Sequence, residues 1–194
     1  NSKLELMVKE LGFPVLVKAS AGGGGKGMQV VHKAEDLMPT IKKLEREAEA
    51  AFGDKTLFVE KFIESPRHIE VQILADKNNN VIHLGERDCS VQRNYQKVIE
   101  ESPSSILSDE QRESICKDAI ELCKEVKYDS VGTVEFIYDQ KDKKYYFMEM
   151  NTRIQVEHPV TEQRCNIDLI AGQIKVAAGQ SLRWKQREIE VNKR

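Results

Sequence analysis

The chain has 194 residues, of which 40% are hydrophobic and 32% are charged, and it carries a formal net charge of -2. That length and apolar content are enough for a buried core in one domain, with or without a smaller lobe. The nearly balanced charge excludes a global field for nucleic acid or an anionic membrane, so a bound anion needs a local cluster of cations. We expect no membrane span and no signal peptide, because no apolar run is long enough for either.

The cysteines lie far apart, lack metal-ligand spacing, and two of them fall in one predicted helix. We therefore expect reduced thiols in a reducing compartment. The chain starts at Asn1 within a helical pattern, and we expect it to be an excerpt of a longer protein. The cysteines are Cys89, Cys116, Cys123 and Cys165.

The first third of the chain reads as helix, strand, loop, strand and helix. A helical pattern stops at Gly12, and "VLV" and "MQVV" flank a glycine run as β-rich stretches. A second helix is predicted before Gly53, and a strand at 57–63 follows it. The apolar face of the second helix consists of Leu37, Ile41, Leu44 and Ala48.

The rest of the chain is predicted to be mostly strands with two further helices. Residues 67–76 alternate, with Ile69, Val71 and Ile73 on one face and His68, Glu70 and Gln72 on the other, and 81–88 return beside them. A helix at 108–128 opens with Ser108 and Gln111 as a capping box, and it carries Ile115, Ala119, Leu122 and Val126 inward. A hairpin at 132–151 and a helix at 167–179 complete the pattern.

Four consecutive glycines, Gly22, Gly23, Gly24 and Gly25, lose much backbone entropy when they are ordered. One reason to have them is that their main-chain amides can approach a ligand more closely than a residue with a Cβ atom allows. A P-loop is excluded because Lys26 lacks a glycine six residues before it and a Ser or Thr after it. A dinucleotide fingerprint fits poorly, since a strand rather than a helix follows. We interpret the run as a flap over nucleotide phosphates, with Lys18 as a point charge; the alternative is a glycine-rich hairpin with an exposed lysine.

The hairpin at 132–151 predicts a pair of opposed carboxylates. If pairing is symmetric about residue 142, Glu135 faces Glu149, and like charges at that separation repel. A divalent cation such as Mg²⁺ would make the pair favourable, and Asn151 on the same face could complete the ligand set. The alternative is a solvated face, and a register slip would also undo the pairing.

Two polar stretches offer further candidates. In "NTRIQVEHPVTE", which shows no helical period, Arg153 can grip a planar anion and Glu157 can serve as a base. His158 is left out, because Pro159 restricts its backbone and a lone histidine is more often structural. In "ERDCSVQRNYQKV", Gln92, Arg93 and Lys97 lie near the predicted site, although a mixed charge run is usually a solvated face.

Several of these stretches closely resemble the ATP-grasp region of biotin carboxylase. They are "FPVLVKASAGGGGKGM", "VEKFIESPRHIEVQILAD", "GERDCSVQRNYQKVIEESPS", "GTVEFIY" and "FMEMNTRIQVEHPVTE", and together they run over essentially the whole chain. "EMNTRIQVEHPVTE" and "RDCSVQR" are highly specific for the biotin-dependent carboxylases. Carbamoyl-phosphate synthetases resemble the family more loosely and are the nearest rival.

The resemblance implies an α+β ATP-grasp fold with two α+β lobes, a mobile glycine-rich lid and an antiparallel sheet in the larger lobe. It places the lid subdomain at 1–64, the larger subdomain with the metal and bicarbonate sites at 65–182, and the start of a linker to a further domain at 183–194.

The resemblance also assigns roles to individual residues. For ATP it implies Lys18, the lid glycines Gly22, Gly23, Gly24 and Gly25, Met28, Glu60, Lys61, Ile63, His68, Gln92 and Ile137. For the metal it implies Glu135, Glu149 and Asn151. For bicarbonate it implies Lys97, Arg153, Gln155 and Val156, with Glu157 as the general base and Arg153 and Lys97 beside it in the catalytic set.

The implied reaction is ATP- and Mg²⁺-dependent (or Mn²⁺-dependent) carboxylation of carrier-bound biotin by bicarbonate through carboxyphosphate. Biotin would arrive on a carboxyl carrier protein or domain, because this chain lacks an attachment sequence. A carboxyltransferase component, N- and C-terminal domains of the same enzyme and a homodimer of the full enzyme are the other implied partners. The expected setting is acetyl-CoA carboxylase in fatty acid biosynthesis, in the cytoplasm or, in a eukaryote, the mitochondrial matrix.

Three positions depart from the family pattern. Tyr95 stands where many relatives have histidine, Asn94 where arginine is common and Ala21 where glycine is common, which puts secondary contacts near the phosphates in doubt. Because relatives add an ATP-contacting lysine and a further arginine from domains outside this segment, we expect these residues alone not to complete turnover.

Two hypotheses from other classes remain. A non-catalytic nucleotide-binding module would keep the glycine run but has no use for Arg153 and Glu157. A plain protein-interaction domain explains neither the opposed glutamates nor the glycines.

Overall fold

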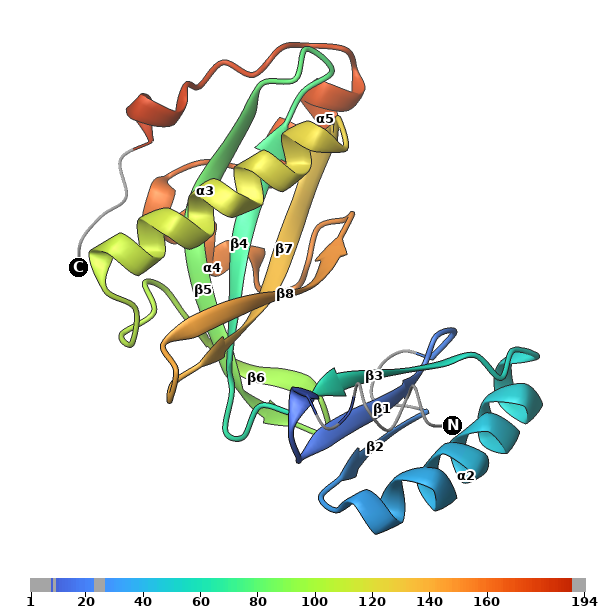
Figure 1. Cartoon of the computed structure of the whole chain (residues 1–194). Coiled ribbons are helices and arrows are strands. Elements are labelled where there is room, and N and C mark those ends of the chain that lie inside the picture. The colour runs from blue at the N-terminus through green and yellow to red at the C-terminus, as the bar shows by residue number, and fades with distance from the viewer. Residues whose placement is uncertain (1–7, 9, 23–26, 190–194) are drawn as a thin grey trace. The chain divides into compact units, whose positions relative to one another are not determined.

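The computed structural model describes residues 8, 10–22 and 27–189, and it divides into two compact units, 1–64 and 65–194. The first unit contains the three-stranded antiparallel sheet β2-β1-β3, built from β1 (Val15–Ala19), β2 (Met28–Val31) and β3 (Leu57–Lys61). Helix α2 (Ala34–Phe52) packs against the sheet (Figure 1). All the residues predicted to face inward from this helix are buried, and Gly53 closes it in a left-handed conformation.

The second unit is a five-stranded antiparallel sheet of order β6-β5-β4-β7-β8 (Figure 1). Both faces of its central strands are covered: α3 packs on one apolar cluster, and α5 packs on another. The strands are β4 (Arg67–Ala75), β5 (Val81–Arg93), β6 (Gln96–Glu101), β7 (Ser130–Asp139) and β8 (Lys144–Asn151). The helices are α3 (Asp109–Glu125), α4 (His158–Cys165), α5 (Leu169–Ala177) and the 3₁₀ turn η1 (Gln186–Glu188).

Helix α3 begins with the predicted capping box, in which Ser108 and Gln111 each bond the other's main chain. Its buried face differs in part from the prediction. Val126 is 62% exposed because it is the C-terminal cap residue, whereas Cys116 and Cys123 are buried. Since all four cysteines are free and buried, they serve as small apolar side chains.

The β7–β8 hairpin has the predicted pairing of Glu135 with Glu149, but it is not symmetric throughout. A register shift follows this pair, so that Phe136 lies opposite Phe147. The extra residue in β8 is a bulge, and it lets the apolar faces continue while the two carboxylates stay opposed.

Three local features were not specified by the sequence. Helix α4 falls in a stretch that shows no helical period, and its first turn contains Pro159, which suits that position. Asn94 and Tyr95 form the two-residue turn of the β5–β6 hairpin, both with positive φ. In the segment 183–189, which was predicted to start a linker, Trp184 packs on the core of the second unit.

None of the helices in the described part of the chain is long and apolar enough to cross a membrane.

Candidate active site

A row of charged residues crosses the second sheet on one face. Strand pairing places Arg87 of β5 beside Glu70 of β4, Glu70 beside Glu135 of β7, and Glu135 beside Glu149 of β8. The alternation in β4 therefore holds, but its polar face is not solvated, because Glu70 is fully buried. The solvated alternative is likewise wrong for Glu135, which is buried, although Glu149 at the end of the row is exposed.

Lys97 joins three carboxylates at the centre of the row. It reaches over from β6, and its Nζ donates to Glu135 Oε1 at 2.9 Å, to Glu157 Oε1 at 2.6 Å and to Glu70 Oε2. Burial alone would lower the pKa of this ammonium, but the surrounding carboxylates outweigh burial and raise it well above its usual value. Lys97 is therefore permanently charged and lies in a buried acid cluster rather than on a solvated face.

His68 adds a second cation to the cluster. Its Nε2 lies 3.1 Å from Glu135 Oε2 and 3.6 Å from Glu70 Oε2, as ion pairs without hydrogen-bond alignment. Although burial lowers the pKa of the imidazole, these carboxylates outweigh it and raise the pKa to about 9. At neutral pH the charges of Arg87, Lys97 and His68 thus balance those of Glu70, Glu135 and Glu157, which is how a buried cluster of this size avoids a large desolvation cost.

Glu135 accepts the most contacts in the cluster. Besides Lys97, its Oε1 accepts from Asn151 Nδ2 and from Gln155 Nε2, each at 2.9 Å. Burial would raise the pKa of this carboxyl, but His68, Lys97 and the amides lower it to about 2. A carboxylate held ionised beside Glu149 and the Asn151 side chain forms a set of hard oxygen donors, which fits a divalent cation such as Mg²⁺.

The structure places a second set of possible metal ligands within the same cluster. The ligand atoms of His68, Glu70 and Glu135 lie within 4.8 Å of one another, as do those of Glu70, Cys89 and Glu157. Glu70 belongs to both groups, but Arg87 and Lys97 already occupy its oxygens. In the predicted pair, by contrast, the carboxylate of Glu149 is exposed at the end of the row.

The chain from Arg153 to Glu157 carries the remaining predicted residues. Glu157 is buried at the start of α4, and Gln155 Oε1 is buried without a hydrogen-bond partner. Arg153 is exposed and donates to Ile154 O and Asn151 Oδ1, while Val156 is 91% exposed. The structure therefore brings Lys97, Gln155 and Glu157 together and leaves Arg153 and Val156 on the open side.

His158, which the sequence analysis leaves out of the site, contacts the main chain. Its Nδ1 lies 2.7 Å from the Gln155 main-chain oxygen, within the turn that begins α4.

The predicted ATP-contacting residues divide between the two units. In the first unit Lys18 pairs with Glu60 at 2.6 Å and lies over the Phe58 ring, and Met28 lies opposite Lys18 in the sheet. Gly22 donates to Ala19 O at the base of the loop, and the lid residues 23–25 lie outside the described residues.

The other predicted ATP residues are placed as follows. Lys61 is exposed at the end of β3 and Ile63 is half-buried beyond it. In the second unit, Ile137 lies opposite His68, and Gln92 donates to Cys89 O at 2.8 Å.

Arg87 and Glu70 are central to the cluster but were absent from the predicted site. Arg87 donates from Nε to Glu70 Oε1 and from Nη1 to Gln72 Oε1, both at 2.6 Å. The polar face of 67–76 was a signal for Glu70, because it places the residue between two others of the site. Arg87 was harder to predict, because its position beside Glu70 becomes clear only from the pairing of β4 with β5.

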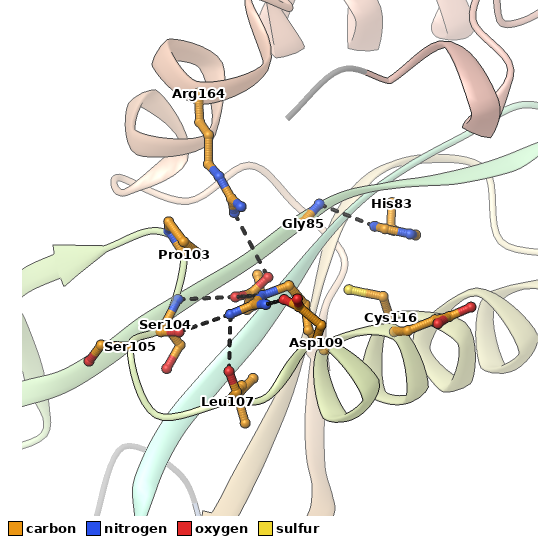
Figure 2. Close-up of a pocket in the computed structure, with 12 residues that line it drawn as sticks. His83, Gly85, Pro103, Ser104, Ser105, Leu107, Asp109, Cys116 and Arg164 are labelled. Atoms are coloured by element: carbon orange, nitrogen blue, oxygen red, sulfur yellow. Dashed lines mark hydrogen bonds and ion pairs between the residues drawn. The ribbon is translucent and has the colours of Figure 1, made fainter. Parts of the chain in front are cut away.

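A separate pocket of about 670 Å³ contains none of the predicted site residues (Figure 2). On its wall, Arg112 donates to Glu86, Asp109 and the main-chain oxygens of Ser104 and Leu107. The guanidinium donors of Arg112 are thus bound to protein groups and connect α3 with its neighbours. We therefore interpret these contacts as structural.

Residues 2–185 match the family described as "Carbamoyl-phosphate synthase L chain, ATP binding domain". The chain belongs to this family. Its ATP-grasp architecture is thereby confirmed, as an α+β fold with antiparallel sheets.

Relatives of this family member confirm the resemblance to biotin carboxylases. It is 54% identical over 184 residues to biotin carboxylase 1 of Bacillus subtilis, covering 95% of the chain and 41% of that protein. It is 50% identical to the mitochondrial propionyl-CoA carboxylase alpha chain of Homo sapiens, covering 96% of the chain and 25% of that protein. The chain thus spans less than half the length of either relative.

A solved structure with 50% sequence identity has the same fold. The biotin carboxylase domain of Hydrogenobacter thermophilus 2-oxoglutarate carboxylase, in complex with MgADP, ADP and bicarbonate, is 50% identical and superimposes with a TM-score of 0.90. The match covers 98% of this chain and 42% of that one.

Proposed function

We propose that this chain is the ATP-grasp part of a biotin carboxylase, which uses ATP and Mg²⁺ to carboxylate carrier-bound biotin with bicarbonate. The observation that carries the proposal is Lys97, which is half-buried and contacts Glu70, Glu135 and Glu157. A non-catalytic nucleotide-binding module has no need for such a cluster, whereas a site that binds an anion and removes a proton from it needs both a fixed cation and a base.

Bicarbonate binding is assigned to Lys97, Arg153, Gln155 and Val156. Arg153 is exposed and can turn its guanidinium to a planar anion, and Lys97 supplies a fixed positive charge. Because Lys97 occupies Glu157 Oε1, the second oxygen of Glu157 takes the bicarbonate proton. The deprotonated oxygen then attacks the γ-phosphate of ATP; the bond from this phosphorus to the β,γ-bridging oxygen breaks, and carboxyphosphate forms as ADP leaves.

The metal site is assigned to Glu135, Glu149 and Asn151. A bound Mg²⁺ supplies positive charge that offsets the charge on the phosphates and on the attacking oxygen. For Glu135 to bind a cation, its contacts with Lys97 and His68 must loosen, which frees Lys97 for bicarbonate.

ATP binding is assigned to residues of both units and to the glycine lid. Lys18 must exchange its ion pair with Glu60 for the phosphates, and closure of the lid keeps water from carboxyphosphate. Biotin comes on a carrier protein or domain and meets a carboxyltransferase component afterwards, in an assembly that includes further domains and a homodimer of the whole enzyme. The residues described here do not complete turnover alone.

The downstream acceptor is proposed to be acetyl-CoA, in fatty acid biosynthesis in the cytoplasm. The support is the similarity to the Bacillus subtilis biotin carboxylase, but relatives that carboxylate other acceptors are almost as similar. Transfer of the carboxyl group from a biotinylated carrier to acetyl-CoA, propionyl-CoA, pyruvate or 2-oxoglutarate, by the full-length protein together with its carboxyltransferase component, tests this choice. Preference for any acceptor other than acetyl-CoA overturns it.

A carbamoyl-phosphate synthetase-like reaction is the second candidate, because the family description carries that name. Both reactions begin with carboxyphosphate, but they differ in the nucleophile that follows. ATP turnover stimulated by biotin supports the first candidate, and turnover stimulated by ammonia supports the second.

Calorimetric titration of MgATP into the chain tests the site directly. We expect Mg²⁺-dependent binding that the double variant Glu135→Gln, Glu149→Gln loses. The matched control is Glu121→Gln, which removes a charge from the exposed face of α3 and leaves binding unchanged. If the double variant binds MgATP as the unaltered chain does, the metal assignment is wrong.

A further inference from the structure

Arg87 is a fully buried charged residue for which the proposed reaction has no direct use. It emerges from β5, and its guanidinium contacts side chains on three other elements. Its Nε donates to Glu70, while its Nη1 donates to Gln72 and, at 2.8 Å, to Thr161 of α4. A fourth, longer contact joins Nη2 to Thr133 Oγ1 on β7.

These contacts lead to two groups of the bicarbonate site. Glu70 accepts Arg87 on Oε1 and Lys97 on Oε2, so one carboxylate lies between the two cations. Thr161 lies one helical turn after Glu157, so the Arg87–Thr161 bond fixes the helix that begins at the base.

Without the charge of Arg87, Glu70 would keep Lys97 and the longer ion pair with His68 as its cations. The attraction between that uncompensated carboxylate and the ammonium would draw Lys97 toward β4, away from Glu135 and Glu157. A lysine held in this way is less available to a small anion.

We propose that Arg87 is a positioning residue for bicarbonate: it neutralises Glu70 and anchors α4, and thereby keeps Lys97 and Glu157 in place for the anion. The inference rests on the proposed function, because it assigns Arg87 to the substrate of that site. It also distinguishes bicarbonate from ATP, since none of the four described side chains that Arg87 contacts is assigned to ATP.

The test compares the apparent KM for bicarbonate with that for ATP in the full-length protein carrying Arg87→Met. We expect the KM for bicarbonate to rise by about 10- to 100-fold, the loss typical when a supporting contact of a site is removed, while the KM for ATP changes less than about threefold. Arg87→Lys, which keeps the charge but not the fork, should show a smaller rise with the same preference. If Arg87→Met does not fold, the two KM values of Arg87→Lys are compared instead.

A double variant separates positioning from a general structural role. If Arg87 acts through Glu70, Arg87→Met combined with Glu70→Gln should recover part of the bicarbonate affinity, because no uncompensated carboxylate is left. The matched control is Thr161→Val, which removes only the contact with α4 and should have the smaller effect. The proposal is overturned if Arg87→Met raises both KM values equally. It is also overturned if the double variant raises the KM for bicarbonate by the product of the two single-variant factors.

The two proposals fail in different ways. Absence of bicarbonate-dependent ATP hydrolysis in the unaltered full-length protein contradicts the proposed function. Normal hydrolysis with an unchanged bicarbonate KM in Arg87→Met contradicts only the role of Arg87.

Discussion

Two buried charge clusters lie on opposite faces of strand β5, and they begin at consecutive residues. Glu86 points toward α3, where Arg112 and the Ser104 main chain bind its Oε1, and Arg87 points to the opposite face and the cluster around Lys97. Around Glu86, one carboxylate is surrounded by fixed donors that join neighbouring segments. Around Lys97, three carboxylates share one lysine whose contacts can be exchanged.

The comparison shows that burial of charge alone does not mark a reaction site. The Glu86 cluster adjoins a pocket, yet the donors of Arg112 are bound to the protein itself. The Lys97 cluster combines a lysine in contact with three carboxylates, one of which is the proposed base, and an adjacent carboxylate pair. We therefore expect substitutions in the first cluster to lower stability and those in the second to lower activity.

The largest expected effect is on activity, through Glu157→Gln. Removing the base should lower bicarbonate-dependent ATP hydrolysis by about 10²- to 10⁴-fold in the full-length protein, because the amide cannot accept the proton. Initial rates at saturating ATP and bicarbonate measure it, with thermal unfolding as the control for folding. A residual rate above about one tenth would contradict the assignment of the base.

The next largest effect is on stability, through Glu86→Leu. Breaking this buried ion pair removes the carboxylate from Arg164 and leaves Arg112 only the exposed Asp109, and we expect a loss of about 3–5 kcal/mol in the free energy of unfolding. Urea denaturation of the chain measures the change, and Glu113→Leu, an exposed neighbour on α3, is the control. A loss below about 1 kcal/mol would show that the Glu86 cluster does not hold this face together.

The pH dependence of stability should report His68. Its pKa is raised from 6.5 to about 9, so its stabilising contribution is complete below pH 6.5 and disappears as the pH rises through 9. We expect a decline of about 1–3 kcal/mol across that window, and none in His68→Gln. Glu135, with its pKa lowered from 4.5 to about 2, contributes above pH 4.5 and loses its contribution as the pH falls through 2. Denaturation midpoints at pH 6 and pH 9 give the comparison, and an equal decline in His68→Gln would exclude this source.

The smallest effect is expected in the first unit, at the partly exposed pair of Lys18 and Glu60. Because solvent screens this pair, Glu60→Gln should change the free energy of unfolding by less than about 1 kcal/mol. Lys18→Met should be equally mild for stability but should weaken MgATP binding, which calorimetry measures. Unchanged affinity would remove Lys18 from the ATP site.

Much of the fold follows from local patterns in the sequence. The helix at 34–52, the capping box at Ser108 and the pairing of Glu135 with Glu149 depend on residues close together in the chain. Helix α4 could not be predicted in this way, because an eight-residue polar segment is too short to show a clear helical period. Its stability comes from contacts with β5, which are distant in sequence.

The candidate site was predictable from the sequence only in part. Glu135 and Glu149 follow from one hairpin, whereas Arg87 depends on pairing across β4 and β5 and on a contact with α4, 74 residues away. The contacts of Lys97 with three carboxylates could not be predicted either, since they depend on how β6 folds back beside β5. The roles taken from the resemblance remain proposals to be tested residue by residue.

The most direct test compares Lys97→Met with Arg112→Met in the full-length protein. Bicarbonate-dependent ATP hydrolysis is measured for both, with thermal unfolding alongside. The account predicts that Lys97→Met removes the bicarbonate dependence of the protein that remains folded, and that Arg112→Met lowers stability but keeps the turnover rate of the folded protein. Retained bicarbonate dependence in Lys97→Met, or its loss in folded Arg112→Met, would contradict the assignment of the reaction to the Lys97 cluster.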